Sequence, residues 1–291
     1  MSGHSLRSTQ SKAVIAALCV LLACTSLVSP KLAADDTDQQ PVIAIIIDDM
    51  GNHFQNGLDL IRLPYPLTLS FLPGRPHSAE LSKLARIHDK EIMLHEPMEN
   101  ILGLQLGKGG LTESMSEYEI KSSLAASLSS IPHIMGINNH MGSKLTTNSQ
   151  TMRWVMEKLT EYPVYFVDSR TSPDSIAAQT ALDYQIPNLS RDVFLDHRQT
   201  RKFVQQQFLK LLEIAREKGT AIAIAHPHRV TIDYLNRALQ KLDEKGIGIA
   251  SISALWQIQH PTQRMFAHRK NQQREWILAQ QRRLIEDSII Q

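Results

Sequence analysis

The sequence predicts an α/β fold in which seven or eight parallel strands alternate with helices, either as a barrel or as a doubly wound sheet. Short apolar runs without polar alternation recur along the chain, which is typical of strands buried on both faces of a parallel sheet. Helical stretches separate these runs. No linker interrupts residues 42–255, so we expect a single domain there.

Eight apolar runs are the candidate strands. The first is a β-branched run, which favours extended backbone, and the sixth is the weakest. Turn-forming or polar residues bound most of them. In chain order they span 42–47, 67–72, 91–94, 134–137, 164–167, 193–195, 221–225 and 247–252.

Six stretches between the strands carry helical signals. Ser116 and Glu119 form a capping-box pattern at the start of the second stretch. Gly219 and Gly246 each follow a Glu-Lys pair, which is typical of the residue just past a helix end. In chain order the expected helices span 78–88, 116–128, 151–159, 173–184, 200–218 and 231–245.

The N-terminal segment has the pattern of a bacterial export signal. Basic residues precede an uncharged stretch at 13–28, which is short compared with the about 20 apolar residues of a membrane span. We expect residues 1–34 to be a signal peptide or an N-terminal anchor and residues 35–41 to be a short polar linker. Cleavage after Ala34 and lipidation of Cys24 are alternatives. The protein is therefore expected in the periplasm, secreted or attached to the membrane through its N-terminus.

The C-terminal segment, residues 256–291, is rich in Gln and Arg and is expected to be a partly helical tail. A solvated tail is the simpler interpretation, because charge runs usually face solvent. Binding to an envelope protein partner or to a membrane surface is the alternative.

Composition disfavours several function classes. Lys and Arg total 31 against 29 Asp and Glu, and aromatic residues make up 5%, which disfavours nucleic-acid binding because that needs a basic face. The two cysteines are Cys19 and Cys24, so the body of the chain has no structural disulfide and no cysteine zinc site. The first strand is not followed by Gly-x-Gly-x-x-Gly, which disfavours a dinucleotide enzyme, and the sequence contains no Gly-x-Ser-x-Gly elbow.

Ionisable residues gather where the candidate strands end. In parallel α/β folds the carboxyl ends of the strands meet at one edge, where functional groups collect. We therefore expect these residues to converge on one site. Four runs end directly at such residues and a fifth ends three residues before one; the residues are Asp48 and Asp49, His95, Asp168, His226 and His140.

Two of these groups suit a metal. Asp48 and Asp49 are adjacent carboxylates that repel one another when buried, so they need a cation there; a turn or a helix cap before Gly51 is the alternative. His95 and His140, together with a carboxylate, form a common zinc-binding set. The alternative for each histidine is a core or surface residue.

Two further groups have open roles. Asp168 and Arg170 combine a carboxylate with a guanidinium, either as a structural ion pair or in the site. His226 and His228 place two imidazoles at a strand end. There they could provide a general acid, a further ligand or a substrate contact, or have a structural role.

Five short motifs carry these residues, in chain order Ile45-Ile46-Ile47-Asp48-Asp49-Met50-Gly51, Leu94-His95-Glu96-Pro97-Met98-Glu99, Asn138-Asn139-His140-Met141-Gly142-Ser143, Asp168-Ser169-Arg170-Thr171 and Ala225-His226-Pro227-His228. Together they resemble the divergent polysaccharide deacetylase family, the YibQ-like proteins, over about residues 42–255. That family is related to the NodB-type carbohydrate esterases. The resemblance therefore implies a distorted (β/α) barrel of seven or eight parallel strands and a divalent metal, commonly zinc.

The resemblance also implies roles for the first motifs. In the standard esterases the first aspartate of the pair is the base and the second binds the metal, which implies Asp48 as the base and Asp49 as a ligand. His95 matches the first histidine of the metal motif, whereas Glu99 stands where the second is expected. We infer that His140, one strand later, is the substitute ligand.

The later motifs complete the expected site. His226 matches the histidine of the late Leu-x-His motif and is implied as the catalytic acid. Glu99, Asp168, Arg170 and His228 are expected to contact the substrate or the ligating side chains. The Arg-x-Pro-aromatic motif of the standard esterases is missing.

These inferences predict a metal-dependent hydrolase that acts on carbon–nitrogen bonds and removes acetyl groups from an N-acetylated envelope polysaccharide. The alternative is a catalytically silent envelope protein that keeps the fold and binds glycan or a protein; the missing arginine motif and the basic tail favour it. A hydrolase of a different ester or amide is a third candidate.

Overall fold

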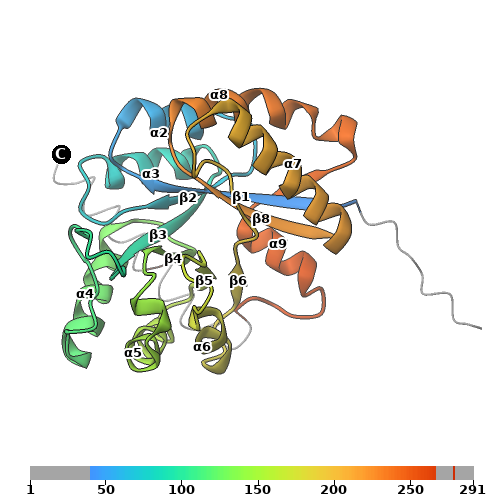
Figure 1. The fold of residues 1–291 in the computed structure, drawn as a ribbon. Coiled ribbons are helices and arrows are strands. Elements are labelled where there is room, and N and C mark those ends of the chain that lie inside the picture. The colour runs from blue at the N-terminus through green and yellow to red at the C-terminus, as the bar shows by residue number, and fades with distance from the viewer. Residues whose placement is uncertain (1–39, 267–277, 279–291) are drawn as a thin grey trace, which may run out of the picture. The chain divides into compact units, whose positions relative to one another are not determined.

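The fold is known from a computed structural model, which describes residues 40–266 and residue 278 (Figure 1). The signal peptide or anchor expected at 1–34 lies outside the described residues, as does most of the tail expected at 256–291. Within the described part of the chain, no helix is both long enough and apolar enough to cross a membrane.

One parallel sheet forms the centre of the fold, in the order β6-β5-β4-β3-β2-β1-β8-β7, with β9 also paired to β1. The sheet curls into a half-barrel that stays open between β6 and β7, which confirms the predicted distorted barrel (Figure 1). The strands are β1 (Val42–Met50), β2 (Thr68–Phe71), β3 (Glu91–Met98), β4 (Gly136–Met141), β5 (Tyr165–Asp168), β6 (Asn188–Ser190), β7 (Val193–Phe194), β8 (Thr220–Ala225) and β9 (Gly248–Ala250).

Helices alternate with the strands as expected. The Ser116 capping box is present, and Gly219 and Gly246 follow helical segments with positive φ of 82° and 63°. The helices are α2 (Phe54–Ile61), α3 (Ser78–Ile87), α4 (Glu117–Ser130), α5 (Ser149–Leu159), α6 (Ala177–Asp183), α7 (Arg201–Lys218), α8 (Arg229–Ala238) and α9 (Ile252–Gln259), with 3₁₀ turns at Leu145–Thr147, Leu239–Lys241 and Asp243–Lys245.

Three elements differ from expectation. α2 was not predicted, and it contains a glycine, Gly57, which disfavours helix. The glycine is needed for packing, because a Cβ at position 57 would overlap Leu81 of α3. The short strand β6 was missed as well. The run at 247–252 is a strand over three residues only, because Ser251 caps a new helix, α9, so the boundary expected after Leu255 falls inside that helix.

The two faces of the sheet bury separate apolar clusters. Ile43, Ile45 and Ile47 of β1 point to the outer face, where they pack in a cluster with apolar residues of α2 to α8. Ala44 and Ile46 point to the inner face, where the cluster includes residues of α9. Along the inner face this apolar layer gives way to polar side chains at the carboxyl ends of the strands, which places the site there.

Glu91 anchors α9 at the opposite end of the half-barrel. Its carboxylate accepts the backbone N–H of Ser253 in the first turn of α9 (3.1 Å) and the Tyr165 hydroxyl (2.7 Å). An acidic group at a helix N-terminus is favourable because it meets unpaired N–H groups and the positive end of the dipole. Gly136 gives the Tyr165 ring its space, since a Cβ at that position would overlap the ring. These contacts fix α9 at the end of the sheet opposite the carboxyl edge, where the site lies.

Candidate active site

A bulge in β1 brings both aspartates to the site. The register between β1 and β2 shifts between Ile47 and Met50, and Asp49 has a positive φ of 56°. In a regular strand adjacent side chains point to opposite faces, so the bulge is what lets Asp48 and Asp49 serve one site. The strand therefore continues to Met50 rather than ending before the aspartates, and bulges of this kind often lie beside functional sites.

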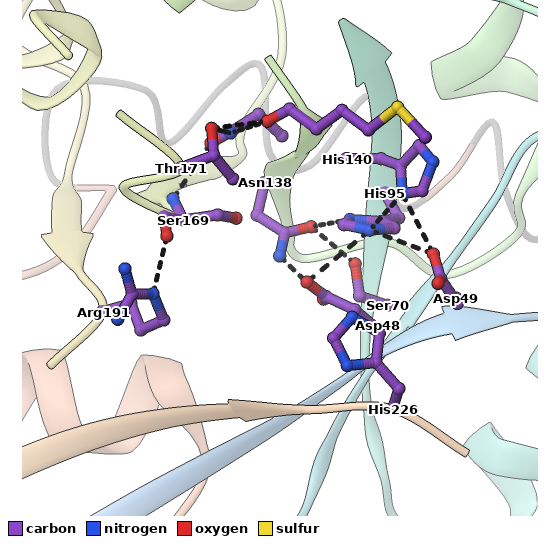
Figure 2. A network of polar contacts seen from close by, with 12 residues as sticks. Asp48, Asp49, Ser70, His95, Asn138, His140, Ser169, Thr171, Arg191 and His226 are labelled. Atoms are coloured by element: carbon purple, nitrogen blue, oxygen red, sulfur yellow. Dashed lines mark hydrogen bonds and ion pairs between the residues drawn. The ribbon is translucent and has the colours of Figure 1, made fainter. Parts of the chain in front are cut away.

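Asp49, His95 and His140 form a compact group of possible metal ligands (Figure 2). Asp49 Oδ1 lies 3.0 Å from His140 Nδ1 and 3.4 Å from His95 Nε2, and the two ring nitrogens are 3.1 Å apart. Three donors bound to one ion at about 2.0–2.2 Å lie roughly 3 Å or slightly more from one another, so the group fits a divalent metal. Apart from these contacts with the two imidazoles, the buried Asp49 Oδ1 has no hydrogen-bond partner in the described part of the chain, as expected of an atom that binds an ion.

The electrostatics of Asp49 agree with a ligand role. Burial alone would raise its pKa, but His140 and His95 outweigh burial and hold the pKa of Asp49 well below its usual range. The carboxylate is therefore ionised over the physiological range, which is the form that binds metals.

Asn138 connects His95 to Asp48. The fully buried amide donates from Nδ2 to Asp48 Oδ1 (2.8 Å), while its Oδ1 accepts the Ser70 hydroxyl (2.7 Å) and lies 2.7 Å from His95 Nδ1. Burial raises the pKa of Asp48, and the charges of His95 and His226 offset only part of that rise. Asp48 Oδ2 lies 3.6 Å from His95 Nε2, beside the metal-binding group.

His226 lies on the far side of Asp48 from Asp49 and His140 (Figure 2), and Asp196 holds its ring. Its Nδ1 lies 2.8 Å from Asp196 Oδ1, while Asp196 Oδ2 accepts the His226 backbone N–H (2.7 Å) and the Thr231 hydroxyl (2.8 Å). Burial lowers the pKa of His226, but the hydrogen bond and charge of Asp196 exceed this effect, with Asp48 and Asp49 adding to it, and raise the pKa to about 9. His226 is therefore protonated at neutral pH, with Nε2 free of the aspartate.

Asp196, His226 and His228 form a second group with metal-ligand spacing. Both oxygens of Asp196 already accept hydrogen bonds, and His228 Nε2 lies 3.1 Å from Gln199 Nε2. The geometry therefore suits His226 as an acid whose ring is oriented by Asp196 better than it suits His226 as a metal ligand.

A cavity of about 190 Å³ lies between the two groups. Arg191 packs its guanidinium 3.8 Å above the Phe194 ring, which lines one wall. Ser169 is buried, and its Oγ has no hydrogen-bond partner among the described residues. The residues around the cavity are Asp48, His95, Asn139, His140, Met141, Ser169, Thr171, Phe194, His197 and His226.

The structure places the other predicted residues outside this centre. Glu99 binds Lys144 (2.7 Å) and the backbone N–H of Glu113 (2.7 Å). Asp168 accepts the backbone N–H of Arg170 (2.8 Å) and a serine hydroxyl rather than the Arg170 guanidinium. Arg170 is exposed. Asp168 thus closes the turn that follows β5.

Two functional residues were not identified from the sequence. Asn138 was noticed only as part of the motif around His140, because nothing in a single sequence distinguishes its role from that of its neighbour Asn139, which is also buried. Asp196 carried a clearer signal, since it follows the weak run at 193–195 as the other aspartates follow their strands.

Comparisons with known proteins concern the family and the fold. A family model described as divergent polysaccharide deacetylase matches residues 45–256. The protein YibQ of Escherichia coli K12 is 34% identical over 200 residues, which cover 69% of this chain and 63% of YibQ, and a Haemophilus influenzae protein is 32% identical over 217 residues, covering 75% and 77%. The crystal structure of ATU2773 from Agrobacterium tumefaciens C58 has the same fold, with a TM-score of 0.72 at 24% identity over 75% of this chain and 89% of that one.

Proposed function

Because this chain belongs to the divergent polysaccharide deacetylase family, we propose that it is a metal-dependent hydrolase that removes acetyl groups from an N-acetylated glycan of the bacterial envelope. One observation carries the proposal. A three-donor metal group, a buried carboxylate and an aspartate-held imidazolium all face one cavity. Metal-assisted amide hydrolysis uses three components of this kind: a metal that acts as a Lewis acid, a general base and a general acid.

Asp49, His95 and His140 would hold the metal, and their one carboxylate and two imidazoles favour zinc. Such an ion, when bound, polarises a carbonyl oxygen and lowers the pKa of water. The chain's contribution is to present one carboxylate oxygen and two ring nitrogens within 4.8 Å of one another from β1, β3 and β4.

Asp48 would act as the general base. Asn138 occupies Oδ1, so Oδ2 is the oxygen available to take a proton from the attacking water. Its position 3.6 Å from His95 Nε2 brings this oxygen to the side of the metal group. The raised pKa of Asp48, caused by burial, makes it a stronger base than an exposed aspartate.

His226 would act as the general acid. Asp196 binds Nδ1, so the proton available for transfer is the one on Nε2. An amine leaves an amide only when its nitrogen is protonated, because an amide anion is a very poor leaving group. General acid–base groups typically contribute about 10²–10⁴ in rate.

The periplasmic location is part of the proposal and is supported by the basic and apolar pattern at the N-terminus. An N-acetylated glycan as substrate is supported by the family. The nearly balanced charge of the chain, 31 basic against 29 acidic residues, suits a neutral polymer.

The test combines metal content with acetate release from N-acetylglucosamine oligomers and from peptidoglycan. We expect Asp48→Asn and His226→Ala to keep bound zinc and lose about 10²–10⁴ in turnover. The exposed residues Asp183 and His88 offer matched controls, Asp183→Asn and His88→Ala, which should keep both. Zinc binding by the unmodified protein without acetate release from either glycan would instead favour a silent glycan-binding protein.

A further inference from the structure

We propose that Asn138 is a positioning residue that selects the tautomer of His95 and thereby sets the affinity of the metal group. The inference rests on the proposed function for its ligand, because it takes Asp49, His95 and His140 as the metal-binding group. It adds a chain of hydrogen bonds from Ser70 and Asp48 through Asn138 to His95, in which Ser70 and Asn138 take no part in the proposed proton transfer.

The curl of the sheet makes this chain possible. Asn138 on β4 pairs in register with His95 on β3, and Ser70 and Asp48 lie on β2 and β1. The Asn138 side chain reaches across the inner face to all three neighbours (Figure 2). Asn138 has no exposed surface, and Ser70, Asp48 and His95 are also buried, so water does not compete for these hydrogen bonds.

The orientation of the amide follows from its partners. The Asp48 carboxylate accepts hydrogen bonds, so the amide NH₂ faces it. The amide oxygen then faces the Ser70 hydroxyl and His95 Nδ1, both at 2.7 Å. The Asp48 carboxylate therefore holds the amide in one of its two flipped orientations, and the Ser70 hydroxyl donates to the amide oxygen in that orientation.

The orientation of the amide decides which nitrogen of His95 is free. An amide oxygen only accepts, so Nδ1 of His95 must carry a proton. The neutral ring then has its lone pair on Nε2, the atom that lies 3.4 Å from Asp49 Oδ1 and 3.1 Å from His140 Nδ1. A hydrogen bond on the distal nitrogen fixes ring orientation and tautomer, and such partners commonly contribute about 10–100-fold in metal affinity.

Two variants test this inference against a merely structural role. Asn138→Leu has similar volume and no acceptor, and Ser70→Ala removes the hydroxyl that donates to the amide oxygen (2.7 Å). Asn148→Ala is the matched control, since Asn148 caps α5 through bonds of 3.0 Å to the N–H groups of Gln150 and Thr151. It should lower stability without reaching the site.

The readouts are zinc affinity by competition with a chelator and the protonation of each His95 nitrogen by long-range ¹H–¹⁵N correlation. We expect zinc affinity to fall about 10–100-fold in Asn138→Leu and about 2–10-fold in Ser70→Ala, and to stay unchanged in Asn148→Ala. In the unmodified protein the neutral His95 ring should carry its proton on Nδ1, and in Asn138→Leu the proton should distribute over both nitrogens.

A proton on Nε2 of the neutral ring in the unmodified protein would overturn the inference, as would unchanged zinc affinity in Asn138→Leu. If Asn138→Leu does not fold, Ser70→Ala decides by the same two readouts, and no change in either refutes the inference. If the unmodified protein binds no zinc, the proposed function fails while the nitrogen protonation of metal-free His95 still decides the role of Asn138.

Discussion

Replacing Asp196 by asparagine should remove most of the elevation of the His226 pKa. The substitution keeps the size of the side chain but removes the negative charge that lies 2.8 Å from His226 Nδ1. In Asp196→Asn, burial still lowers the pKa of His226, and only the smaller effects of the Asp48 and Asp49 charges raise it. We expect the pKa to fall from about 9 towards or below the ordinary value of 6.5.

The size of the change in stability follows from the difference between the His226 pKa of about 9 and its ordinary value of 6.5. About 2.5 pH units correspond to roughly 3 kcal/mol between the two protonation states of His226, whose side chain is 26% exposed. Because the folded pKa is raised, this stabilisation is fully present below about pH 6.5 and is lost as the pH rises through about 9. The stability difference between the unmodified protein and Asp196→Asn should therefore be largest in mild acid and shrink by up to roughly 3 kcal/mol in alkali.

The assay is an NMR titration of His226 in the metal-free protein, paired with kcat/KM against pH. A general acid works when protonated, so the alkaline limb of kcat/KM should lie at lower pH in Asp196→Asn than in the unmodified enzyme. Thr231→Val is the matched control, because it removes the hydroxyl bonded to Asp196 (2.8 Å) and keeps the charge. A His226 pKa that stays near 9 in Asp196→Asn would refute the reasoning.

His140→Ala should reduce bound zinc, read by metal analysis of the purified protein, because it removes one of three donors; full metal content would exclude His140 as a ligand. Ser169→Ala removes a buried hydroxyl that lines the cavity and has no hydrogen-bond partner within residues 40–266, so we expect unchanged thermal stability and a KM raised by roughly 5-fold. Gly136→Ala should destabilise the fold by about 1–3 kcal/mol in urea, because the new Cβ overlaps the ring of Tyr165; wild-type stability would show that the ring can move. Ser116→Ala should cost about 1 kcal/mol in the same assay, since it removes the helix cap of α4.

The sequence predicted the sheet and the metal group because both depend on local patterns. Buried parallel strands are continuous apolar runs, and residues that follow such strands meet at one edge. This argument predicted one site at the strand ends, and the family resemblance then selected Asp49, His95 and His140 as the metal set. The structure places the donor atoms of these three residues within 4.8 Å of one another. The same argument applies to Asp196, which was passed over because β7 has only two residues.

Other features depend on contacts that a single sequence does not encode locally. The bulge that turns Asp48 and Asp49 to the same side arises from register with β2. Asp168 resembled a site residue from its position, but its carboxylate is used by the backbone of its own turn. The side chain of Asn138 is held by hydrogen bonds with Ser70 and Asp48, which lie 68 and 90 residues away in the sequence.

The order of the strands has a consequence for how the chain reaches its native state. β1 is the first strand in the described part of the chain, yet it pairs with β8 (Thr220–Ala225) and β9 (Gly248–Ala250), near the other end. Contacts of such long sequence separation form late and slowly. Until residue 225 is available, one edge of an apolar strand stays unpaired, and the two aspartates it carries have no fixed place. Chains truncated before β8 should therefore aggregate and fail to form the candidate site, although most of its residues are present in them.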